Sequence, residues 1–101
     1  MNSVNLIGRL VADPAFQVVN DKELTKFVLA VDGRGEQAHF IECACWGKTA
    51  ELVANHFVKG KQIGVTGELR QERWENKDGA KRSKLTVNVN NVTFVGKKGE
   101  E

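Results

Sequence analysis

The placement of hydrophobic residues constrains the fold most, because they alternate with polar residues along five segments and recur at helical spacing in one. Alternation with a period of two is typical of a β-strand that buries one face. The alternating segments are Val4–Leu10, Phe27–Val31, His39–Trp46, Ile63–Trp74 and Leu85–Phe94. The helical segment, capped by Thr49 and ended by Gly60, lies between the third and fourth of these. The chain is therefore predicted to be mostly β-sheet, with one helix.

This order of elements, three strands, one helix and two strands, is that of an OB-fold. Such a domain is a five-stranded Greek-key barrel with a helix between strands three and four. Polar or glycine-rich turns would join neighbouring strands at Asn20–Lys22, Asp32–Gln37 and Asp78–Gly79. The pair Asn90–Asn91 shifts the register of the last strand, which indicates a β-bulge. Another small barrel is the alternative, but the position of the lone helix favours the OB-fold.

The size of the chain and the absence of long apolar runs limit its organisation. With 101 residues, the chain fits one domain, expected at 1–96, with a short polar end at 97–101. No apolar run approaches the roughly 20 residues that span a membrane. The strand pattern begins almost at Met1, which leaves no room for a signal peptide, so we expect a cytoplasmic protein. The net charge of +2 does not by itself indicate a nucleic-acid partner.

The two cysteines, Cys43 and Cys45, are two residues apart on one face of the third strand. Their Cα atoms would lie about 6.5–7 Å apart, at or beyond the limit for a disulfide. His39 shares their face, but a structural zinc site needs four converging ligands rather than three in a row. We therefore expect two small buried thiols, no metal site and no cofactor.

The sequence offers no convincing catalytic site. Gly47-Lys48-Thr49 matches the end of a phosphate-binding loop, but Glu42 stands where that loop requires a glycine. His56 is an isolated residue on the surface of the expected helix, and no serine, histidine and acid set is apparent. The chain is therefore not predicted to be an enzyme.

The outward face of the third strand carries Phe40, Glu42, Ala44 and Trp46, which suits neither a core nor an ordinary surface. Exposed aromatic rings on a sheet serve as stacking platforms for unpaired bases. The two rings are six residues apart, about 20 Å along a strand, so an extended single strand could lie across both. Glu42 opposes a polyanionic ligand. Alternatively, one ring packs on a neighbouring subunit or under a loop.

A third aromatic residue, Trp74, stands in a charged hairpin far from any apolar run. Arg70 and Glu72 share its face of the fourth strand. The second side of the hairpin adds Lys81, Arg82 and Lys84. Rings beside cations can bind bases and phosphates together. The alternative is a solvated hairpin with a half-buried tryptophan.

Long segments of the sequence resemble the bacterial single-stranded DNA-binding proteins (SSB). The matching segments include "VNLIGRLVADP", "FIECACWGKTAELVANHFVKGKQIGVTGELRQERWENKDG" and "LTVNVNNVTFVG". This resemblance implies an OB-fold subunit of a homotetramer that binds single-stranded DNA without sequence preference. It also implies a role in DNA replication, recombination or repair, an association with the nucleoid, and no catalysed reaction.

The resemblance assigns roles to individual residues. Phe40, Trp46 and Trp74 fall where the family has DNA-stacking aromatics, although many members have Trp at the first position and Phe at the second. The residues implied to contact phosphate are Lys48, Lys59, Arg70 and Arg73, with Arg9 and Lys26 as secondary candidates. In the family the connection at Asp32–Gln37 is usually a long basic hairpin, of which only Arg34 remains here.

Other departures from the family weaken the expected DNA contacts or bear on the expected partners. Glu72 replaces a frequently basic residue, and the ending "GKKGEE" lacks the long acidic tail of many members. Replication and repair partners that bind this tail are therefore not expected. A shortened hairpin and low net charge would also fit an SSB-derived adaptor of the replication-restart type, which works mainly through protein contacts. The three retained aromatics favour DNA binding over this adaptor function. A purely structural OB module is the second rival, and the exposed tryptophan pair argues against it.

Overall fold

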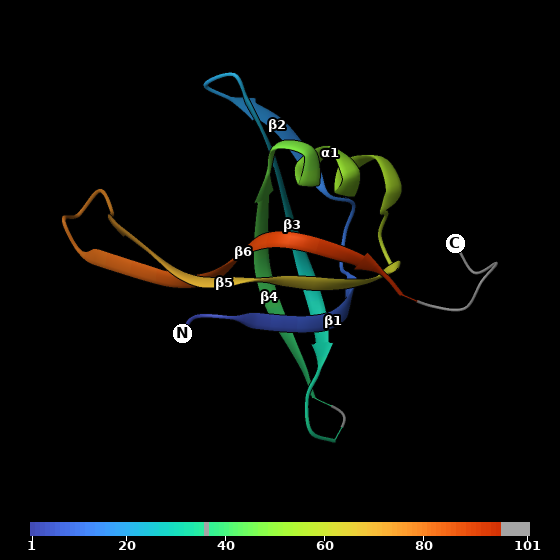
Figure 1. Cartoon of the computed structure of the whole chain (residues 1–101). Coiled ribbons are helices and arrows are strands. Elements are labelled where there is room, and N and C mark those ends of the chain that lie inside the picture. The colour runs from blue at the N-terminus through green and yellow to red at the C-terminus, as the bar shows by residue number, and fades with distance from the viewer. Residues whose placement is uncertain (36, 96–101) are drawn as a thin grey trace.

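The computed structural model describes residues 1–35 and 37–95, and these form six strands and one helix (Figure 1). In chain order the elements are β1 (Val4–Leu10), β2 (Ala15–Val19), β3 (Lys22–Asp32), β4 (Ala38–Trp46), α1 (Gly47–His56), β5 (Gln62–Glu75) and β6 (Lys81–Phe94). The polar end predicted at 97–101 lies outside the described residues. No helix in the described part is long and apolar enough to cross a membrane.

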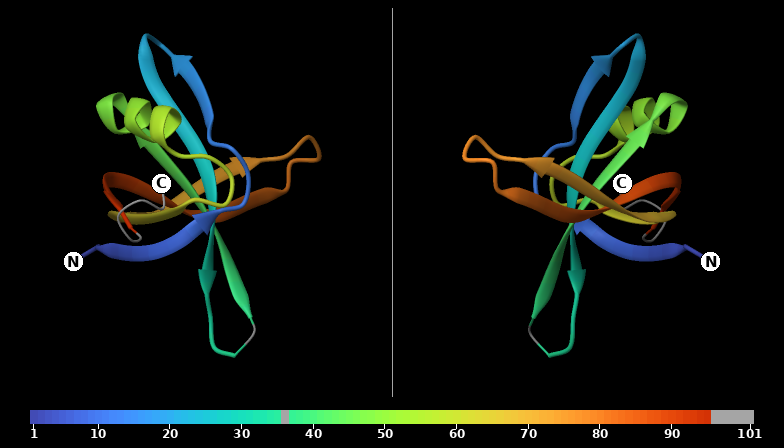
Figure 2. Two further views of the ribbon diagram at one scale, coloured as in Figure 1. Left: turned by 90° about the vertical axis from the view of Figure 1, so that its right-hand side faces the viewer. Right: turned by 90° about the vertical axis from the view of Figure 1, so that its left-hand side faces the viewer.

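The strands close into a barrel, as predicted. Strand β1 pairs antiparallel with both β5 and β3, and the pairs β5–β6 and β3–β4 are also antiparallel. A short parallel pairing of Cys43 with Val87 and of Ala44 with Asn88 joins β4 to β6. The circuit β1-β5-β6-β4-β3 therefore returns to β1. Figure 2 shows the hairpins β2–β3 and β3–β4 and the outer part of β5–β6 extending from this barrel.

The structure contains one more strand than the five predicted. The predicted second strand began at Phe27, whereas β3 begins at Lys22 and pairs through its first residues with β2. The turn between them has positive φ at both Asn20 (49°) and Asp21 (65°), as a tight two-residue hairpin requires. Strand β2 was not predicted because four of its five residues are exposed, so it has no buried face that would make hydrophobic and polar residues alternate.

The start of α1 differs from the prediction that Thr49 caps the helix. The helix begins at Gly47, directly after β4, and Trp46 occupies the cap position without a side-chain hydrogen bond. Gly47 has a φ of 65°, which L-residues rarely adopt, and this lets the chain turn from strand to helix at one residue. The helix also ends earlier than the predicted stop at Gly60, because its last residue is His56 and Phe57 already has an extended conformation.

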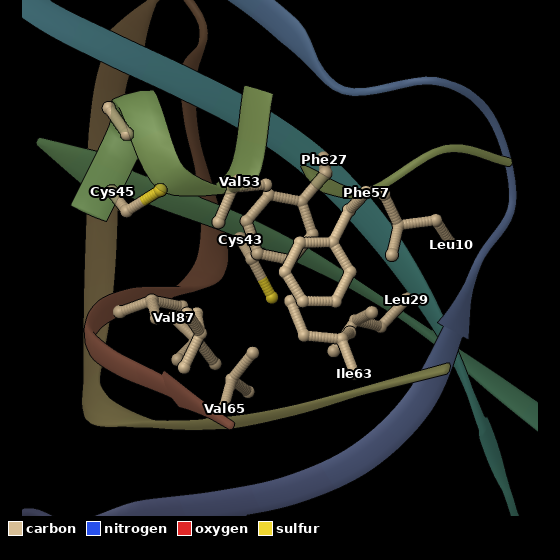
Figure 3. Packing of buried hydrophobic residues seen from close by; sticks show 13 residues of the cluster. Leu10, Phe27, Leu29, Cys43, Cys45, Val53, Phe57, Ile63, Val65 and Val87 are labelled. Carbon is tan, nitrogen blue, oxygen red and sulfur yellow. The ribbon is translucent and has the colours of Figure 1, made fainter. Parts of the chain in front are cut away.

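The core lies inside the barrel and beneath α1, where the inward faces of the strands meet the buried face of the helix (Figure 3). Its largest fully buried side chains include Phe57, Leu29 and Ile63. Both cysteines are buried free thiols, as predicted. Burial raises the pKa of Cys43 to about 12 and that of Cys45 to about 11, so both remain protonated at neutral pH.

One hydrogen bond and one β-bulge help to position the strands around this core. The hydroxyl of buried Thr25 donates a hydrogen bond of 2.7 Å to the Ala50 carbonyl and so ties β3 to α1. The predicted bulge is present, because Thr66 pairs with Asn91 but Gly67 pairs with Val89. A Cβ atom at Gly67 would lie 2.0 Å from the Asn88 carbonyl oxygen, so this close approach requires glycine.

Beyond the bulge, β5 and β6 continue as a long two-stranded arm that leaves the barrel (Figures 1 and 2). The Asn76 side chain closes its tip by accepting hydrogen bonds from the backbone N–H groups of Asp78 and Ala80. At the base of the arm, the Asn2 side chain exchanges two 2.8 Å hydrogen bonds with the backbone of Leu69. This contact extends the β1–β5 ladder and supports the arm where it leaves the barrel.

Candidate nucleic-acid interface

The outward face of β4 carries its aromatic side chains toward solvent, as the alternation predicted. Phe40 is 68% exposed and Trp46 is 41% exposed, while Cys43 and Cys45 face the core. Because β3 pairs with β4 in register, Lys26 lies opposite Ala44 on the same outward face. A small residue and a cation thus stand beside the two rings.

A groove of about 540 Å³ runs across this face toward the arm. Trp46 and Glu42 of β4 and Lys26 of β3 line one part of it. Arg70 of β5 and Lys84 of β6 line another part, where the arm leaves the barrel. The groove therefore combines an exposed ring with cations from three strands.

Glu42 is paired within this groove. Its Oε1 accepts a 3.0 Å hydrogen bond from Lys84 Nζ, and both side chains remain partly exposed. This hydrogen bond and the charge of Glu42 raise the pKa of Lys84 above its usual value. Glu72 lies directly across the β5–β6 ladder from Lys84 and adds to this effect. The negative charge that opposed a polyanionic ligand is thus partly compensated, at the cost of one cation.

The arm carries the third exposed ring. Trp74 is 47% exposed and lies opposite Arg82 in the β5–β6 ladder. Arg73 and Lys81 line a second hollow together with Trp74. The arm therefore presents an aromatic platform surrounded by three basic side chains, some distance along the sheet from the β4 rings.

The model of the single-strand binding protein family matches residues 1–95. The chain belongs to this family. It is 41% identical to the single-stranded DNA-binding protein of Clostridium tetani, over 94% of this chain and 70% of the relative. It is 35% identical to the protein of that name from Treponema pallidum, over 95% of this chain and 58% of the relative. It is also 36% identical to single-stranded DNA-binding protein 1 of Synechocystis, over 97% of this chain and 86% of the relative.

Family membership confirms the resemblance seen in the sequence and the OB-fold that the barrel shows. The chain spans little more than half the length of the Treponema relative. The matched region includes every described strand and α1, and with them Phe40, Trp46 and Trp74.

The structure places the residues implied to contact phosphate at different distances from the groove. Arg70 and the secondary candidate Lys26 line it directly. Lys59 lies at its rim, because the Lys59 N–H donates a 2.8 Å hydrogen bond to Asp13, which lines the groove. Arg9 is bound to the neighbouring loop through a 3.0 Å hydrogen bond to the Gly60 carbonyl.

Three other basic candidates lie outside the groove. Lys48 is exposed in the first turn of α1, two residues after Trp46. Arg34 is exposed in the β3–β4 turn, beyond the Phe40 end of β4. Arg73 belongs to the hollow around Trp74 and donates a hydrogen bond to the Gln71 side chain. The predicted cations therefore extend along the outer surface rather than forming one cluster.

The structure places one secondary candidate in the groove and shows one contact that the sequence did not predict. Lys26 was only a secondary candidate, although it is an exposed cation within a largely apolar strand, and that break in the pattern was a usable signal. The ion pair between Lys84 and Glu42 had no local signal. Among the described residues, no group of three His, Cys, Asp or Glu side chains could hold a metal ion.

Proposed function

We propose that this chain binds single-stranded DNA without sequence specificity and protects it during replication, recombination or repair. Bases would stack on Phe40, Trp46 and Trp74, and nearby cations would contact the phosphates. The proposal rests above all on these three rings, which are exposed in a member of this family, Trp46 in the groove and Trp74 in the hollow of the arm. No reaction is catalysed, because stacking and charge neutralisation are enough for this role.

The exposed rings suit unpaired rather than paired bases. A base offers its π-face to a side chain only when it is free of its neighbours in a duplex, and each such stack contributes about 1–3 kcal/mol. Lys26 and Arg70 can neutralise phosphates on the groove side of the rings. Single strands should therefore bind far more tightly than a duplex of the same length.

Tryptophan fluorescence tests this function directly. Saturating oligo(dT) should quench most of the emission, because both tryptophans are among the proposed platforms. Trp46→Phe and Trp74→Phe each keep a ring while removing one emitter, so each variant should report quenching at the remaining site. A duplex of equal length serves as the control, and affinity should fall as salt rises. Unchanged emission in a folded protein at saturating DNA would instead favour the adaptor function.

We further propose that the chain assembles as a homotetramer. Within the described residues, Val4–Gly8 of β1 pair only with β5, which leaves their other edge open to a second chain. The exposed side chain of Ile7 lies on this strand, and those of Leu69 and Leu85 are exposed on the arm. Burial of such surfaces between copies would remove apolar area from water.

Light scattering at micromolar concentration should give about four times the 11.2 kDa mass of one chain. Ile7→Lys should shift this mass toward smaller species, because a charge would be buried at the proposed contact. Val58→Lys is the matched control, since Val58 is similarly exposed but follows α1. A wild-type protein that scatters only as a monomer would disprove the assembly.

A further inference from the structure

We propose that Glu42 gives the exposed face of β4 beside Phe40 a base preference, favouring bases that carry an exocyclic amino group over thymine. This inference rests on the proposed binding of single-stranded DNA and refines it. A bias at one position remains compatible with binding that requires no defined sequence.

The position of Glu42 next to a ring places its carboxylate beside the edge of a stacked base. Phe40 and Glu42 lie two residues apart on the same exposed face of β4, about 7 Å along the strand. A base lying on the Phe40 ring would extend past the ring, because stacked arrangements are offset. A glutamate side chain can reach across this separation to the base edge.

Lys84 holds the carboxylate in place and leaves part of it free. The ion pair engages Oε1 at 3.0 Å, and the hydrogen bonds of the described residues leave Oε2 without a partner. Lys84 belongs to β6, so the Glu42 side chain is held by a strand outside the β3–β4 hairpin in which Glu42 lies. The pair thus presents an oriented acceptor whose charge is partly balanced.

The chemistry of an ionised carboxylate determines which bases it favours. It accepts hydrogen bonds and donates none. Cytosine N4 and adenine N6 carry amino donors, whereas thymine presents the O4 acceptor at the corresponding place. Glutamate accepting from cytosine N4 is a known form of direct readout. An oriented Glu42 should therefore attract the cytosine edge and repel the thymine O4.

The charges of the groove direct the DNA backbone away from Glu42. The groove is lined by three basic residues, Lys26, Arg70 and Lys84, and by three acidic residues, Asp13, Glu42 and Glu72. Since Lys84 already serves Glu42, only Lys26 and Arg70 are available to phosphates from this set. Phosphates near these two cations would leave the base edges to face the carboxylate.

The test compares oligo(dC) and oligo(dT) of equal length, bound by the wild type and by Glu42→Gln. Two pyrimidines expose similar areas for stacking, so the ratio Kd(dT)/Kd(dC) isolates the edge contact. Glutamine keeps the side-chain length but can donate to thymine O4. The ratio should fall by about threefold to tenfold in the variant, the effect of one ordinary net hydrogen bond at a solvent-exposed position.

Two control variants separate the edge contact from charge. Glu51→Gln removes the same charge from the exposed side of α1, and its ratio should equal that of the wild type. Lys84→Met removes a cation but keeps the Glu42 carboxylate, so both affinities should fall while thymine remains disfavoured. The inference would be overturned if Lys84→Met abolished the preference in Kd(dT)/Kd(dC) while Glu42→Gln left that ratio at its wild-type value.

The outcomes also distinguish this inference from the proposed function. If both oligonucleotides bind and Glu42→Gln leaves the ratio unchanged, the base preference is wrong and the proposed function stands. If the folded wild type binds neither oligonucleotide, both proposals fail. Glu42 is exposed, so the substitution should not disturb folding, and Glu42→Met provides a second variant without a hydrogen-bonding side chain.

Discussion

Replacement of the three proposed stacking rings, Phe40, Trp46 and Trp74, by alanine should reduce the affinity for single-stranded DNA by at least about a hundredfold. Each base–ring stack contributes about 1–3 kcal/mol, so three losses exceed two powers of ten even at the lower limit. The rings are not members of the buried core cluster, and the variant should therefore remain folded. The remaining cations would still attract phosphates, but only through screened charges.

Fluorescence anisotropy of a labelled oligonucleotide measures this loss, since the variant has no tryptophan left. The matched control replaces three other exposed apolar residues with alanine, namely Phe16, Val18 and Val58. This control removes apolar surface away from the proposed platforms and should keep the wild-type affinity. If the ring variant kept an affinity within threefold of the wild type, stacking would not be the basis of binding.

The sequence predicted those elements in which one face is buried. In β1 and β4, every second side chain faces the core, and this arrangement appears directly as alternation in the sequence. Strand β2 has no such face and was missed, although its turn at Asn20–Asp21 was predicted. The start of α1 was misplaced because the chain turns at Gly47, and backbone freedom there replaces a capping side chain.

Within the candidate site, the rings were predictable and their electrostatic setting was not. The exposed positions of Phe40 and Trp46 follow from their parity in β4, so the strand pattern was enough. The pair Glu42–Lys84 joins residues that are 42 positions apart in the chain. Their contact depends on the short parallel pairing of β4 with β6, which no local pattern reveals. The pairing of strands that are distant in the sequence therefore determines how the negative charge of Glu42 is partly compensated.

The core residue Phe57 should be among the most costly to truncate, and Phe57→Ala is expected to lower the free energy of unfolding by about 3–5 kcal/mol. Phe57 is 1% exposed and follows α1 directly. Its ring stacks on Phe94 at the end of β6, with centroids 5.0 Å apart and planes 16° from parallel. Removal of the ring would leave a cavity at the junction of the helix and the barrel.

Urea denaturation followed by circular dichroism measures this change, and Phe94→Ala is the matched control. Phe94 is the other member of the stacked pair but is 48% exposed, so its truncation opens no enclosed cavity. Its loss should cost about 1 kcal/mol, the scale of an aromatic pair at a partly exposed site. Equal losses for both variants would mean that the stacked pair, rather than burial, dominates. Neither residue lines the groove. Each variant should therefore bind single-stranded DNA with the wild-type affinity at urea concentrations where it is folded. This result would separate the stability of the barrel from the surface that binds DNA.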